Sequence, residues 1–113
     1  MQVKQKPKGD VAVCNISGEI NIDTVPELQK IFKKILLEKT RKILLNFKEL
    51  DYIDSSGLAC LIQFSKDLNG KQGAVFFSDL SPTVRSLFAI TKLESAFNIY
   101  DTQDEALRNF GGY

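Results

Sequence analysis

Short apolar runs alternate with amphipathic stretches along this chain, and that alternation restricts its fold more than any other feature. The runs 11–16, 42–47 and 74–77 are mostly apolar at consecutive positions, which is typical of strands covered on both faces. Residues 28–36 place apolar side chains at helical spacing and lysines mainly on the opposite side. Strands that alternate with helices predict βαβ crossovers, so we expect an α/β fold with a mixed, mostly parallel sheet.

Capping and turn signals place the remaining elements. Thr24 and Glu27 form a capping-box pattern ahead of the helix 28–36, and Ser81-Pro82 is typical of a first helical turn. Ser17-Gly18 is expected to end the strand 11–16. We also expect an edge strand at 3–6, a second helix at about 56–68, a last strand at 97–100 and a terminal helix capped by Thr102. The buried stripe expected for the second helix is Leu58, Leu61, Ile62, Ser65 and Leu68.

The length of the chain limits how many elements it contains. Its 113 residues fit one domain with a modest core. We therefore expect a single domain over 1–113, with about four or five strands covered by about four helices.

Composition excludes several classes of function. The chain has no histidine, which removes Ser-His and Cys-His nucleophile pairs and every histidine-containing zinc site. Its 15 basic and 14 acidic residues leave a net charge of +1, which argues against a strong electrostatic grip on nucleic acid or on an anionic membrane. Cys14 and Cys60 stand in apolar segments and are expected to be buried, reduced thiols. We expect no metal and no cofactor.

Targeting signals are the next constraint. No apolar run approaches the roughly 20 residues that a membrane helix needs. Residues 1–10 are polar and lysine-rich and lack the apolar core of a secretory signal. We therefore expect a cytoplasmic protein.

The segment 51–58 has the residue types that could carry a function. Ser55, Ser56 and Gly57 stand where a loop enters a helix. A helix N-terminus accommodates an anion, so either serine is well placed to carry a phosphate. The alternative is an ordinary helix cap, which serine and aspartate supply in many proteins.

The residues present exclude several other chemistries for this segment. A hydrolase nucleophile elbow needs a Gly-x-Ser-x-Gly pattern and a histidine base, and the chain has neither around Ser55. A phosphoryl-accepting aspartate of the receiver type needs an acidic pair at a strand end, which neither 15–18 nor 43–47 provides. Glycine spacings that cradle phosphates are absent.

Taken together, these residues resemble the STAS domain and, within it, the bacterial anti-sigma factor antagonists. The resemblance spans nearly the whole chain. Its most specific part is the run Asp51–Leu58, with Asp54-Ser55-Ser56-Gly57-Leu58 as the signature. Further matching segments are Gly18-Glu19-Ile20 with Asp23, Asn46-Phe47, Asp79–Pro82, Thr91-Lys92-Leu93 and Asp101–Leu107. After Leu58 the chain has Ala59-Cys60, where a second glycine is common in the family.

The resemblance implies a regulatory protein and not an enzyme. In this family the serine after the aspartate of the signature accepts a phosphoryl group, which implies Ser55 here. The kinase is the anti-sigma factor itself, which the unphosphorylated antagonist captures, thereby releasing a sigma factor. A PP2C-type phosphatase resets the switch. The residues implied in partner binding are Asp23, Asp54, Ser55, Ser56 and Gly57.

Other functions stay open at the level of sequence. The chain could be the STAS module of a stress-signalling scaffold or of a transporter. A nucleotide-binding domain and a purely structural domain with capping serines are the remaining alternatives. The residues by themselves do not distinguish Ser55 from Ser56 as the phosphate acceptor.

Overall fold

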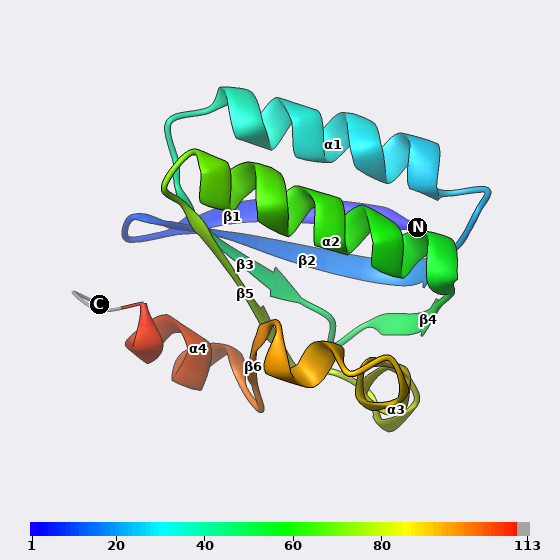
Figure 1. The fold of residues 1–113 in the computed structure, drawn as a ribbon. Helices are drawn as coiled ribbons and strands as arrows, with labels where there is room; N and C mark the ends of the chain where they lie inside the picture. Colours follow the sequence, from blue (N-terminus) through cyan, green and yellow to red (C-terminus); the bar gives the residue numbers. More distant parts are fainter. Residues whose placement is uncertain (111–113) are drawn as a thin grey trace.

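A computed structural model describes residues 1–110 and contains six strands and four α-helices in that range (Figure 1). Residues 111–113, the end of the expected 1–113 domain, lie outside the described residues. In chain order the elements are β1 (Gln2–Lys8), β2 (Val11–Ile20), α1 (Val25–Leu37), β3 (Lys42–Asn46), β4 (Leu50–Ile53), α2 (Ser55–Gly70), β5 (Ala74–Ser78), α3 (Pro82–Ile90), the 3-10 turn η1 (Leu93–Ser95), β6 (Asn98–Tyr100) and α4 (Gln103–Asn109).

The strands form one mixed sheet in the order β1-β2-β3-β5-β6, and β4 pairs with the far end of β2. Only β1 runs antiparallel to its neighbour among the described pairings, and the others are parallel. The predicted α/β class with a mostly parallel sheet is therefore confirmed. The predicted strand number of about four or five was too low because β4 was not foreseen.

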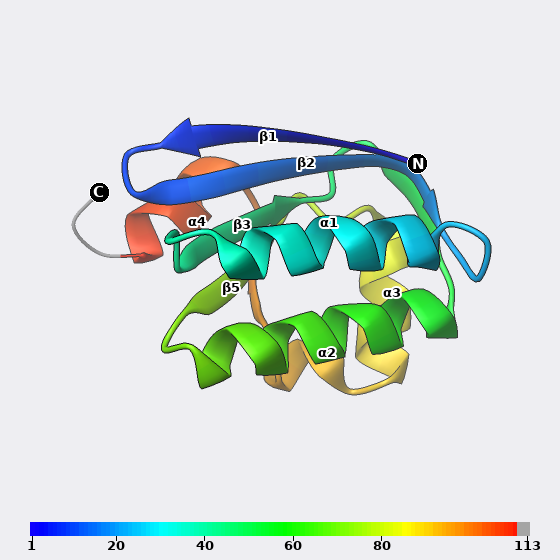
Figure 2. The same ribbon diagram turned by 90° about the horizontal axis from the view of Figure 1, so that it is seen from above.

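Helices cover both faces of the sheet. α1 and α2 run side by side over one face, and α4 covers part of the other (Figures 1 and 2). The larger core lies under α1 and α2, and α3 adds Val84 and Phe88 to it. A smaller core forms where Ala106 and Leu107 of α4 meet β2 and β3. Both cysteines are buried, as predicted.

The predicted end of β2 at Ser17-Gly18 was wrong. The strand continues to Ile20, and its pairing shifts register between Gly18 and Glu19. Gly18 has φ +87°, a left-handed conformation that glycine adopts without a steric penalty. The glycine therefore makes a bulge that bends the strand toward β4 and does not stop it.

The predicted stripe of α2 was partly wrong. Phe64 is buried and its ring stacks on Phe32 of α1, with 3.9 Å between ring centroids, whereas Ile62 and Ser65 are only half-buried. The reason is that α2 packs against α1 as well as the sheet, which rotates the buried face toward its neighbour. The predicted caps of α3 and α4 are confirmed, because Ser81 and Thr102 each accept a backbone hydrogen bond at the helix start.

None of the helices within residues 1–110 combines the length and apolar composition that a membrane span requires.

Candidate functional site

The predicted site lies where β4 ends and α2 begins. Asp54 is the N-cap of α2, and its Oδ1 accepts hydrogen bonds from the Gly57 N–H at 2.9 Å and the Ser56 hydroxyl at 2.6 Å. Ser55 is the first residue of the helix, one position earlier than the sequence predicted. The site therefore stands at the positive end of the α2 dipole, which favours an anion.

The two serines occupy different environments. Ser56 is half-buried, and its hydroxyl is committed to Asp54. Ser55 is exposed, and within residues 1–110 its hydroxyl has no hydrogen-bond partner. Ser56 therefore helps to build the cap, whereas Ser55 offers its hydroxyl to solvent.

Asp54 also connects α2 to the loop between β2 and α1. Its Oδ2 accepts a hydrogen bond from the Ile22 N–H at 3.1 Å, and its own N–H donates to the Ile20 carbonyl at 3.1 Å. The Ser56 hydroxyl, followed by the Gly57 N–H, lowers the pKa of Asp54 below its usual range despite the opposing effect of burial. The carboxylate is therefore ionised at neutral pH.

The loop 21–24, which carries Asp23, has its own internal hydrogen bonds. Asn21 Oδ1 accepts from the N–H groups of Asp23 at 2.9 Å and Thr24 at 3.1 Å. Thr24 Oγ1 accepts from the Asn21 N–H and donates to the Glu19 carbonyl. The side-chain cap predicted for Thr24 is therefore not formed, because its hydroxyl points back into the loop. Asp23 itself is exposed.

Gly57 is in the first turn of α2 and is buried. A Cβ atom at this position would stand 2.7 Å from side-chain carbons of both Ile20 and Ile53. The missing side chain therefore lets α2 pack closely against β2 and β4. This close packing determines how far Ser55 stands from the sheet.

An apolar groove borders Ser55, and sequence reasoning missed it. It lies between the end of β4 and α3, encloses about 430 Å³ and includes Tyr52, Leu87 and Ile90 in its lining. Tyr52 is 45% exposed and Ile90 is 78% exposed, so the groove presents large apolar side chains to solvent. The only sequence signal was that Ile90 falls outside the inward stripe of α3. Ile22 at the tip of the neighbouring loop is 72% exposed as well.

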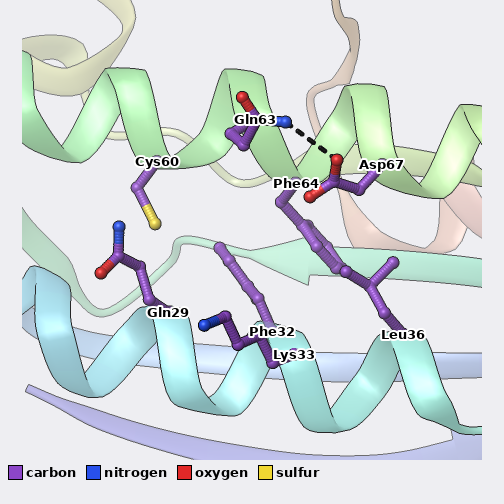
Figure 3. A pocket seen from close by; sticks show the side chains of 8 residues that line it. All are labelled: Gln29, Phe32, Lys33, Leu36, Cys60, Gln63, Phe64 and Asp67. Carbon is purple, nitrogen blue, oxygen red and sulfur yellow. Dashed lines mark hydrogen bonds between the residues drawn. The ribbon is translucent and has the colours of Figure 1, made fainter.

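A second hollow lies between α1 and α2, away from the serines (Figure 3). It encloses about 170 Å³ over the stacked rings of Phe32 and Phe64. The Cys60 side chain points into it, but burial raises the pKa of this thiol, which keeps it protonated. Gln63 on the rim donates to Asp67 of the same helix. Nothing in this lining links it to the Ser55 region.

The chain is similar to known proteins in both sequence and structure. The sequence model of the STAS domain family matches residues 2–106 of this chain. The anti-sigma-B factor antagonist of Staphylococcus aureus is 30% identical over 84 residues, which are 74% of this chain and 78% of that protein. An anti-sigma factor antagonist from Mycobacterium paratuberculosis has a TM-score of 0.88 at 24% identity, over 96% of this chain and 92% of that one. The phosphorylated form of the Bacillus cell fate determinant SpoIIAA has a TM-score of 0.72 at 21% identity, over 96% and 99% of the two chains.

Proposed function

Because this chain belongs to the STAS domain family and, within it, to the anti-sigma factor antagonists, we propose that it captures an anti-sigma factor that is also a serine kinase, and that phosphorylation of Ser55 releases that partner. Capture of the anti-sigma factor frees a sigma factor for transcription. A PP2C-type phosphatase restores the binding form. The chain acts as a regulatory binding protein in this scheme.

The observation that carries the proposal is the difference between the two serines. The Ser55 hydroxyl is exposed and unbonded within residues 1–110, so a kinase reaches it without unfolding the helix. The Ser56 hydroxyl is 2.6 Å from Asp54 Oδ1, and phosphorylation there would break the cap. This contrast supports Ser55 as the acceptor and Ser56 as a residue that shapes the surface.

The charge of a phosphate on Ser55 is large enough to switch partner binding off by electrostatic repulsion. It adds about −1.5 to −2 charges at neutral pH. A like-charge pair about 4 Å apart costs about 4 kcal/mol at an effective dielectric near 20, and about 3 kcal/mol already weakens binding roughly a hundredfold. The ionised carboxylate of Asp54 and the exposed acidic residue Asp23, next to Ile22 in the loop bonded to Asp54, add to the repulsion that an acidic partner meets. In the free chain, the α2 N-terminus helps to hold the phosphate.

The surface around Ser55 suits a protein partner. Tyr52, Leu87 and Ile90 supply apolar area beside the hydroxyl, and the exposed Ile22, whose N–H bonds to Asp54, adds further apolar area near the site. Apolar anchors surrounded by polar groups are the usual anatomy of a protein interface. Gly57 is part of this site through packing, since it has no side chain to offer a partner.

The test is capture of the anti-sigma factor kinase by purified variants. We expect Ser55→Ala to bind as the wild type does and to resist phosphorylation, and Ser55→Asp to lose binding by about a hundredfold. Ser95→Asp, which places the same charge on an exposed serine of η1, is the control and should bind normally. Equal binding by Ser55→Ala and Ser55→Asp would rule out the switch and favour a STAS module that serves a scaffold or a transporter.

A further inference from the structure

The tip of the loop 21–24 is attached to the rest of the site by one side chain. Within residues 1–110, the N–H groups of Asn21, Asp23 and Thr24 bond to atoms of the loop itself. The Ile22 N–H is different, because it crosses to Asp54 Oδ2, 32 positions away in the sequence. The internal bonds fix the shape of the loop, whereas the bond to Asp54 relates the loop to α2.

The two oxygens of Asp54 have separate tasks. Oδ1 accepts from Gly57 and Ser56 and so caps α2. Oδ2 accepts from Ile22 and so holds the loop. A helix cap needs only one side-chain oxygen, and serine or asparagine supplies it as well as aspartate does. The second acceptor is what a carboxylate adds at this position.

We propose that Asp54 is a positioning residue whose second carboxylate oxygen holds Ile22 and Asp23 in register with Ser55, so that two segments distant in sequence form one preorganised recognition surface. This inference rests on the proposed function for its effect on binding. Asp54 then acts through the loop, in addition to the direct binding role that the family resemblance implies.

The consequence for binding is entropic. A loop that is free to move must be ordered when the partner binds, and that ordering weakens affinity. One lost hydrogen bond changes an equilibrium by roughly three- to tenfold. We therefore expect loss of the Ile22 bond to weaken partner capture by about that factor, and to leave the helix in place.

The decisive variant is Asp54→Asn. Its amide oxygen still caps α2, but its NH₂ group cannot accept from the Ile22 N–H. Asp54→Ser is a second variant with a cap and no second acceptor. Thr102→Ala is the matched control, because it removes the cap of α4 on the other face of the sheet and touches neither the loop nor Ser55.

Two measurements separate this inference from the proposed function. Backbone ¹⁵N order parameters of the isolated chain should fall from about 0.85 to below about 0.6 at Ile22 and Asp23 in both Asp54 variants, and stay high at Gly57. Kinase capture should weaken roughly three- to tenfold in both variants and remain unchanged in Thr102→Ala.

Unchanged order at Ile22 in the Asp54 variants overturns the positioning role, whatever the wild type binds. A mobile loop combined with wild-type affinity overturns it too, because the loop would then not need to be held. Failure of the wild-type chain to capture any anti-sigma factor kinase contradicts the proposed function, and the order parameters still decide the role of Asp54.

Discussion

Replacing Gly57 with alanine tests how closely α2 sits on the sheet. The new Cβ atom would lie 2.7 Å from Ile20 Cγ2 and from Ile53 Cγ1, and 3.2 Å from the Ile20 carbonyl oxygen. Both isoleucines are buried, at 0% and 3% exposure, and their β-branched side chains have few alternative rotamers. The first turn of α2 must therefore move away from β2 and β4. Overpacking of this kind costs about 1–3 kcal/mol.

Gly70 provides the matched comparison. It lies at the other end of α2, and a Cβ atom there would have no neighbour within 4 Å. Replacing glycine with alanine in a helix raises stability by up to about 1 kcal/mol because alanine has the higher helix propensity. This gain roughly cancels when Gly57→Ala is compared with Gly70→Ala. The difference between them is then the clash alone, about 1–3 kcal/mol. For 113 residues this is a difference in Tm of roughly 4–12 °C.

Thermal and urea unfolding followed by circular dichroism measure both variants against the wild type. We expect Gly57→Ala to unfold first and Gly70→Ala to equal or exceed the wild type in stability. A Gly57→Ala variant as stable as Gly70→Ala would refute the close approach of α2 to the sheet, and with it the account of how Ser55 is placed.

Three further predictions follow from the site and the core. Ile90→Glu should weaken partner capture roughly tenfold without unfolding the chain, whereas Leu37→Glu, equally exposed at the end of α1, should not; equal effects would exclude the groove as an interface. Burial raises the pKa of Cys14 to about 12, so native protein at pH 8 should not react there with a thiol reagent until it unfolds, and fast labelling would contradict the burial. Ser56→Ala should raise the pKa of Asp54 toward its usual value, read from its ¹³C carboxyl shift. Because the pKa of Asp54 is lower in the folded chain than in the unfolded chain, its hydrogen bonds stabilise the fold at pH values above the unfolded pKa. That stabilisation is lost as the pH falls through the folded pKa. An Asp54 titration that is the same in Ser56→Ala as in the wild type would refute this role of Ser56.

Local sequence patterns predicted the elements whose signals are complete within a few residues. The helical spacing of residues 28–36 marked α1, and Ser81-Pro82 marked the start of α3. β4 was missed because it has only four residues and two of them, Asp51 and Tyr52, face solvent. Its identity as a strand depends on pairing with β2 beyond the Gly18 bulge, which is a tertiary property.

The site was predicted in its position but not in its internal roles. The segment 51–58 indicated a helix start that favours an anion, and the family resemblance singled out Ser55. The separation of the serines depends on the orientation of the Asp54 carboxylate, which is set by hydrogen bonds from two segments, the loop 21–24 and the first turn of α2. The groove depends on β4 and α3 meeting, and no local pattern encodes that contact.

The most direct test of the switch is to incubate the purified chain with its anti-sigma factor kinase and ATP, map the phosphate by peptide mass spectrometry, and measure capture before and after. The account predicts a single phosphoryl group on Ser55, none on Ser56, and loss of capture by the phosphorylated chain. Phosphate on Ser56, or a chain phosphorylated on Ser55 that still captures the kinase with full affinity, would contradict it.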